Sequence, residues 1–112
     1  MTFSLVARCA RTGMFGIAIA SSSPAVAARC ANARAGVGAV SSQNVTDPTL
    51  GPKTLDLMER GLDALSALEE LKGTAEFLEY RQVIVVDNKG LTAIHSGKNS
   101  LGIWNEKQAE NV

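Results

Sequence analysis

The sequence predicts an α+β fold in which helices pack against one face of an antiparallel sheet. Its apolar segments occur in the order strand pair, strand, helix pair, strand pair along 112 residues. Short turns join the strands of each pair, so the paired strands run antiparallel. The chain is 46% hydrophobic but only 4% aromatic, which indicates one globular domain over residues 1–112 with an aliphatic core.

The first two strands are expected over residues 3–9 and 14–20, which alternate or run apolar on either side of a tight turn. In that turn Gly13 supplies the positive φ that a hairpin requires. Residues 25–31 are rich in alanine, and their pattern fits either a helical turn or an irregular crossover. Residues 36–42 carry small side chains at alternate positions, which predicts a third strand that another backbone or a ligand approaches closely.

Two helices are expected next. Pro52 is typical of a first helical position, and apolar spacing predicts a helix from about residue 51 to residue 60. Asp63 is a good N-cap for a second helix whose leucines form one face and which ends at Gly73. A short helical turn is expected within residues 74–80.

The last strand pair is predicted over residues 81–87 and 91–95, where β-branched residues are frequent and an Asn-Lys-Gly turn separates the segments. Asp87 is interpreted as a turn residue. The pattern decays from residue 97 onward, and we expect a strand or helix to be interrupted at the end of the chain.

Charge and composition exclude several functions. Eleven Lys and Arg residues balance eleven Asp and Glu residues, and aromatic residues are few, so we expect no nucleic-acid partner. No apolar run approaches the roughly 20 residues of a spanning helix, and no secretory signal is present, so we expect a cytoplasmic protein without a membrane partner. Cys9 and Cys30 lack metal or disulfide spacing and are interpreted as reduced, buried small residues. We expect no metal and no cofactor.

Thr2 is the candidate catalytic residue, provided that Met1 is removed. A threonine with a free α-amino group carries nucleophile and base on one residue, because that amine has a pKa of roughly 7.7–8.0. The other interpretation of this position is an ordinary β-branched strand residue.

A series of motifs extends over residues 2–97 in a characteristic order and spacing. They are the opening strand 2–8, Thr12-Gly13, the strand 16–21, the segment 35–40 followed by Gln43, Asp47-Pro48, Gly51-Pro52, the segment 85–90 and His95-Ser96-Gly97. In these motifs the chain resembles the DUF1028 family, assigned to the N-terminal nucleophile (Ntn) hydrolase superfamily. The agreement is specific for the fold, because it consists of many motifs in the same order and spacing and does not depend on one motif.

The resemblance implies a four-layer αββα sandwich and hydrolysis of an amide, lactam or ureido-like C–N bond. An N-terminal hydroxyl or thiol would attack the carbonyl, and the α-amine would carry the proton. Family members continue past the His-Ser-Gly segment, so residues 1–112 are expected to be a portion of an Ntn-hydrolase-like domain that a second chain completes.

Cleavage of a precursor after Val112 would explain this length. The present chain would then be the α subunit, and a β chain from the same precursor would begin with a new Ser, Thr or Cys nucleophile. Truncation is the other explanation. The expected partners are this β chain, a small-molecule amide substrate and further copies of the αβ unit, because half a sandwich exposes apolar surface.

Six further residues are candidates for substrate binding: Ser21, Ser22, Ser23, Gln43, Asn44 and His95. The serines end the second strand, where they either bind substrate or form a turn before a proline. The two amides follow the third strand and either orient a polar substrate or form an ordinary loop. The histidine ends a strand and has either a binding or a structural role.

Two functions of other classes fit the same sequence. One is a noncatalytic structural or assembly protein that retains Met1 on this scaffold. The other is a small-ligand-binding module that uses the serines and Gln43 without turnover.

Overall fold

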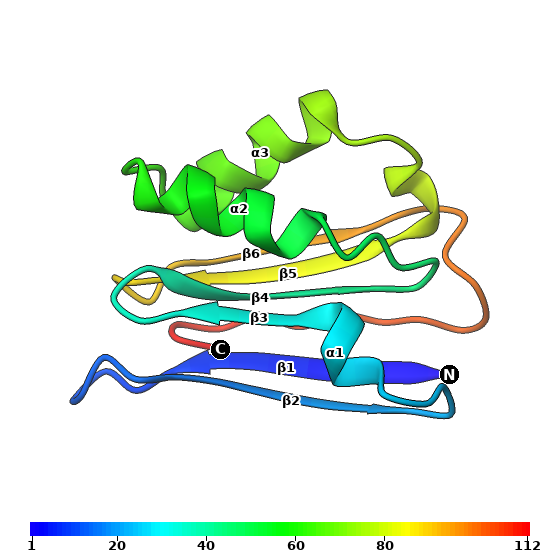
Figure 1. Cartoon of the computed structure of the whole chain (residues 1–112), viewed down its shortest axis with the longest axis horizontal. Helices are drawn as coiled ribbons and strands as arrows, with labels where there is room; N and C mark the ends of the chain where they lie inside the picture. Colours follow the sequence, from blue (N-terminus) through cyan, green and yellow to red (C-terminus); the bar gives the residue numbers. More distant parts are fainter.

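Two antiparallel sheets lie face to face, and a pair of helices covers the outer face of the larger sheet (Figure 1). The computed structural model describes all 112 residues. The smaller sheet has the order β1-β2 and the larger has the order β3-β4-β5-β6. The strands are β1 (Thr2–Arg8), β2 (Phe15–Ser21), β3 (Ala31–Arg34), β4 (Gly38–Gln43), β5 (Gln82–Asp87) and β6 (Thr92–Ser96). The predicted α+β class is confirmed.

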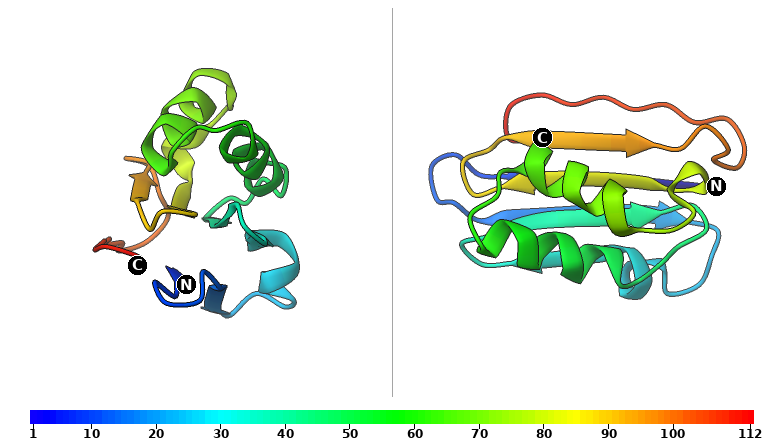
Figure 2. Two further views of the ribbon diagram at one scale, coloured as in Figure 1. Left: turned by 90° about the vertical axis from the view of Figure 1, so that its left-hand side faces the viewer. Right: turned by 90° about the horizontal axis from the view of Figure 1, so that it is seen from above.

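The helices are α1 (Val26–Cys30), α2 (Leu50–Glu59) and α3 (Ala64–Thr74), and a 3₁₀ turn spans Leu78–Tyr80. Figure 2 shows α2 and α3 side by side over the larger sheet. Their leucines form the main core together with valines of β4 and β5, among them Leu68, Leu71, Val40 and Val83. Burial of these aliphatic side chains is the principal source of stability, at about 25 cal/mol per Å² of apolar area.

A second, smaller core lies between the two sheets. Val6 of β1 packs here with Ala39 of β4 and Val86 of β5, and Phe15 and Ile17 of β2 extend the cluster. Side chains alternate between the two faces of a strand, so the even-numbered residues of β1 point toward the larger sheet. This alternation determines which residues face the space between the sheets.

The outer face of the smaller sheet is uncovered. Phe3 is 69% exposed and Leu5 is 47% exposed, and their partners across the strand pair, Ala20 and Ala18, are also exposed. The outer face of this sheet is therefore largely apolar. None of the helices is both long and apolar enough to span a bilayer.

The strand β3 is an element that the sequence did not predict. Residues 25–31 resolve into α1 and the first residue of β3, and Ala25 enters the helix in the left-handed conformation (φ 51°). The four residues Ala31–Arg34 contain no β-branched side chain, so their strand depends on antiparallel pairing with β4. The predicted burial of Cys30 is confirmed, whereas that of Cys9 is wrong, because Cys9 is exposed in the turn after β1.

The side chain of Asp87 connects the start of α3 to the turn between β5 and β6. Its carboxylate is buried and accepts hydrogen bonds from the backbone N–H groups of Ala64 (2.9 Å), Lys89 (2.8 Å) and Leu91 (3.0 Å). Asp87 is therefore a turn residue, as the sequence indicated, and it also holds the first residue of α3.

The segment after β6 forms neither a helix nor a strand as far as Val112. It runs back between the two sheets, and the backbone of Asn111 contacts both β1 and the turn between β5 and β6. The backbone N–H of Arg8 donates to the carbonyl of Asn111 (2.9 Å), and the N–H of Asn111 donates to the carbonyl of Gly90 (2.9 Å).

Candidate functional site

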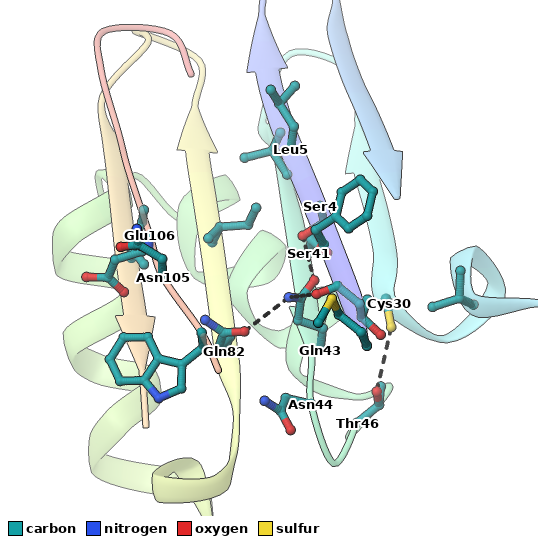
Figure 3. Close-up of a pocket in the computed structure, with 18 of the residues that line it drawn as sticks. Ser4, Leu5, Cys30, Ser41, Gln43, Asn44, Thr46, Gln82, Asn105 and Glu106 are labelled. Atoms are coloured by element: carbon teal, nitrogen blue, oxygen red, sulfur yellow. Dashed lines mark hydrogen bonds between the residues drawn. The ribbon is translucent and has the colours of Figure 1, made fainter. Parts of the chain in front are cut away.

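A groove of about 790 Å³ lies between the two sheets. Its walls come from β1, β4, β5 and β6, and the C-terminal residues 101–108 lie along its mouth. Figure 3 shows the side chains that line it. A concave site of this size with mixed polar and apolar walls is large enough for a small-molecule ligand.

The side chains between the two sheets change from apolar to polar along the strands. Near Arg8 it is filled by the apolar cluster of Val6, Ala39 and Val86. At the Thr2 end the same strand faces carry Gln43 and Gln82. Buried polar side chains are unfavourable in a core unless they are hydrogen-bonded, so their concentration at one end identifies the candidate site.

Thr2 is the first residue of β1 and lies at this polar end. It pairs with Ser21 of β2, and the two hydroxyls are hydrogen-bonded at 2.8 Å. The N-terminal ammonium of Met1 donates to the hydroxyl of Ser22 (3.3 Å), and the backbone N–H of Ser23 donates to Ser21 Oγ (3.1 Å). The structure therefore brings the three candidate serines together with Thr2.

Gln43 connects β1 to the larger sheet. Its Nε2 donates to the backbone carbonyl of Thr2 (3.2 Å) and to Gln82 Oε1 (3.1 Å), and its Oε1 accepts from the hydroxyl of Ser4 (2.7 Å). Figure 3 shows the side chains of Ser4, Gln43 and Gln82 joined in this way. Gln82 continues the chain by donating to Ser96 Oγ (3.1 Å). These contacts hold the first residues of β1 in place.

The loop after β4 is held in a strained conformation. Asn44 and Val45 both have positive φ (66° and 50°), which is costly for a β-branched residue. Arg81 Nε donates to the carbonyl of Val45 (2.7 Å), and Asn44 Oδ1 accepts from the backbone N–H of Leu101 (3.1 Å). Asn44 lines the groove beside Gln43, so the structure brings this candidate into the site.

His95 does not join the site. It pairs with Val83 in the β5–β6 ladder and shares the face that points to the helices. Its Nε2 is 2.9 Å from the carbonyl oxygen of Leu78. This contact attaches the 3₁₀ turn to β6.

Val112 lines the same groove, but near the other end of β1. Asn111 contacts Arg8 through both its backbone and its side chain, whose Oδ1 accepts from Arg8 Nη1 (3.2 Å). The six-residue separation of Thr2 and Arg8 along a strand corresponds to about 20 Å. The proposed processing position and Thr2 thus lie at opposite ends of the groove.

Three site residues were missed by the sequence reasoning, Ser4, Ser41 and Gln82. All three lie on the groove side of their strands, and Ser41 precedes Gln43 by two residues and so shares its face. Because side chains two positions apart on a strand share a face, Ser41 could have been identified once Gln43 was a candidate. Gln82 could not have been identified in this way, because its strand was predicted without a face assignment.

The exposed thiol of Cys9 lies outside this site. A hydrogen bond with the Thr12 side chain is the main reason why the pKa of Cys9 is lowered from its ordinary value. Cys9 belongs to the β1–β2 turn, at the end of β1 opposite Thr2, and does not line the groove. This thiol is therefore not a candidate nucleophile for chemistry beside Thr2.

Comparison with known proteins agrees with this architecture. Residues 2–112 match the model of the "Family of unknown function (DUF1028)". No curated protein sequence matches the chain significantly. The crystal structure of protein SPO2555 from Silicibacter pomeroyi, which carries the same family description, superposes with a TM-score of 0.92 at 23% identity, over 98% of this chain and 49% of that one. The likeness shows a shared fold, and the chain spans about half the length of that neighbour. The chain belongs to the DUF1028 family.

Proposed function

We propose that this protein is an Ntn-type hydrolase that cleaves an amide, lactam or ureido-like C–N bond, with Thr2 as the nucleophile after removal of Met1. The observation that carries the proposal is the position of Thr2. Its hydroxyl lies at the polar end of the groove, 2.8 Å from Ser21 Oγ, and its backbone carbonyl is held by Gln43. A nucleophile that is fixed from two sides beside a ligand-sized groove is preorganised for attack.

The reaction would proceed in two steps. The Thr2 hydroxyl forms a C–O bond to the substrate carbonyl while its proton passes to the α-amine of the same residue. The C–N bond then breaks as the α-ammonium returns this proton to the leaving nitrogen, which leaves an ester on Thr2. Water hydrolyses the ester by the same proton route and regenerates the hydroxyl. The bond between the Thr2 and Ser21 hydroxyls would orient the nucleophile.

The uncovered face of the smaller sheet supports the αββα architecture that the resemblance implies. We propose that a β chain from the same precursor supplies the fourth layer and packs helices on Phe3, Leu5 and Ala18. The apolar exposure of these residues supports this, as does the solved neighbour, which is about twice the length of the present chain. Association of αβ units into larger assemblies would follow from any apolar surface that this layer leaves open.

Cleavage after Val112 provides a second candidate nucleophile. Val112 lines the groove, so a hydroxyl or thiol residue that followed it would begin within reach of the same ligand. It would act at the Arg8 end, whereas Thr2 would act at the polar end. The two candidates therefore predict labelling of different residues.

A cytoplasmic location forms part of the proposal. Both cysteines are free, and Cys9 is exposed. Exposed free thiols persist in reducing compartments and are oxidised elsewhere.

The proposal is tested by measuring the intact mass and N-terminal sequence of every chain in the purified native protein, followed by reaction with a β-lactone probe. We expect an N-terminal Thr2 that becomes acylated with a 1:1 mass increase. Thr2→Ala should abolish acylation and Thr2→Ser should retain it. Thr12→Ala is the matched control, because this exposed turn hydroxyl is remote from the groove.

Each other outcome identifies an alternative. Acylation of the first residue of a second chain would assign the chemistry to a β subunit. A retained Met1 without labelling would favour a noncatalytic structural protein. A free Thr2 that binds amides without releasing product would favour a ligand-binding module.

A further inference from the structure

Ser41 is a buried polar residue that has no partner within the chain. Its side chain is 0% exposed, and its Oγ makes no hydrogen bond. A buried hydroxyl left unsatisfied costs about 1–3 kcal/mol. Ser41 lines the groove on the same face of β4 as Gln43. An unpaired hydroxyl in that place is available to a ligand.

The neighbouring side chains retain further hydrogen-bonding capacity. Both N–H groups of Gln43 are used, but its Oε1 accepts only one bond, from Ser4. Gln82 Nε2 makes one bond, to Ser96, so its second N–H is free. The Ser4 hydroxyl donates to Gln43 and keeps its lone pairs. These four residues, which we call the polar row, are Ser4, Ser41, Gln43 and Gln82. The polar row offers both donors and acceptors.

The polar row carries no charge. Gln43 and Gln82 are 8% and 9% exposed, and Ser41 is fully buried. A carboxylate or phosphate placed there would lose its hydration without gaining a cation, which is strongly unfavourable. Three cations line the groove: the N-terminal ammonium, Arg29 and Lys107. The ammonium donates to Ser22 Oγ, Arg29 donates to the carbonyl of Pro24, and Lys107 is exposed, so none of them is bonded to the polar row. Glu106 at the mouth would repel an anion. A neutral group with its own donors and acceptors fits better.

We infer that the polar row is the subsite for a neutral carboxamide or urea group of the ligand, and that the protein discriminates against carboxylates at this position. The inference that the polar row binds the substrate rests on the proposed function, because the link between the row and Thr2 is the hydrogen bond from Gln43 to the backbone carbonyl of Thr2. The binding preference itself requires no reaction at Thr2. The substrate class is then a small neutral amide or ureide, and the carboxylate product is released because it no longer matches the site.

The test uses the native protein with Thr2→Ala, so that no turnover occurs, and a pair of probes that differ only in this group, propionamide and propionate. Titration is followed by the backbone amide NMR signals of β4 and β5. We expect propionamide to shift these signals and to bind at least tenfold more tightly than propionate. Ser41→Ala should weaken propionamide at least fivefold.

Ser42→Ala is the matched control. Ser42 is 1% exposed and its hydroxyl is likewise unpaired, but it lies on the opposite face of β4 and outside the groove. Neither substitution removes a hydrogen bond, so both variants should fold. Ser41→Cys, which keeps the shape and replaces the hydroxyl with a weak donor, should weaken propionamide in the same way if Ser41→Ala proves unstable.

Equal binding of propionamide and propionate would overturn the inference, as would unchanged affinity in both Ser41 variants or signal shifts confined to other strands. Failure of the proposed function is recognised separately. If the β-lactone does not acylate Thr2 while propionamide binds as described, the subsite stands and the hydrolase assignment falls.

Discussion

The side-chain amide of Gln43 donates a hydrogen bond to the backbone carbonyl of Thr2 over 3.2 Å and so joins the first residue of β1 to the last residue of β4. The two residues are 41 positions apart in the chain. Gln43 is almost fully buried, and its other contacts to Ser4 and Gln82 leave it little freedom to rotate. The position of Thr2 therefore depends on the larger sheet as well as on its own strand pair.

Gln43→Glu is expected to slow acylation of Thr2 by the β-lactone about tenfold or more, because the new side chain keeps its shape but cannot donate when ionised. The rate is measured at a temperature where circular dichroism shows the variant fully folded. Asn99→Asp makes the same change from amide to carboxylate at an exposed position outside the groove and should react like the wild type. A wild-type rate in Gln43→Glu would exclude a positioning role.

Asp87→Asn is expected to lower the free energy of unfolding by about 3 kcal/mol, because one carboxylate that accepts three backbone N–H groups is replaced by an amide that repels one of them. Urea denaturation measures the change. Asp56→Asn removes an exposed carboxylate paired with Arg34 and should cost less than about 1 kcal/mol. Similar losses in the two variants would contradict the role assigned to Asp87.

Stability should fall in acid below about pH 4. The backbone N–H of Ser66 lowers the pKa of Asp63 from its ordinary 3.8, and the Thr49 side chain lowers that of Asp47. Because both carboxyls have lower pKa values in the folded state, their contribution is fully present above 3.8 and is lost as the pH falls through the folded values.

The measurement is the thermal midpoint at pH 6 and pH 3. Asp63→Asn preserves a good N-cap but no longer titrates, so this variant should lose less stability between the two pH values than the wild type. An unchanged pH response in Asp63→Asn would show that other groups dominate acid unfolding.

Leu5→Lys is expected to weaken association with the proposed β chain about tenfold or more, because it places a charge at the centre of the apolar outer face of β1–β2. Sedimentation velocity of the purified protein measures the association. Leu65→Lys on α3 is the matched control, since Leu65 is 60% exposed and α3 lies on the other side of the larger sheet from β1 and β2 (Figure 1). If both variants associate like the wild type, the outer face of the smaller sheet is not the interface.

The sequence alone predicted most of the regular elements. Apolar alternation and a glycine turn indicated the β1–β2 hairpin, and capping residues and leucine spacing indicated α2 and α3. These signals are local, since each depends on residues within one or two turns of chain. The sequence also led to Thr2, because it directly follows Met1, and to the serine cluster and Gln43, because they stand at strand ends.

The tertiary structure decided which faces meet. Side-chain alternation shows that Ser41 and Gln43 share a face, but only sheet stacking places that face toward Thr2. By the same rule His95 turns toward the helices, away from the groove. The strand β3 has no local signal and exists through its pairing with β4. The elements thus follow from short-range patterns, whereas the site depends on contacts between segments some 40 residues apart, which periodicity cannot specify.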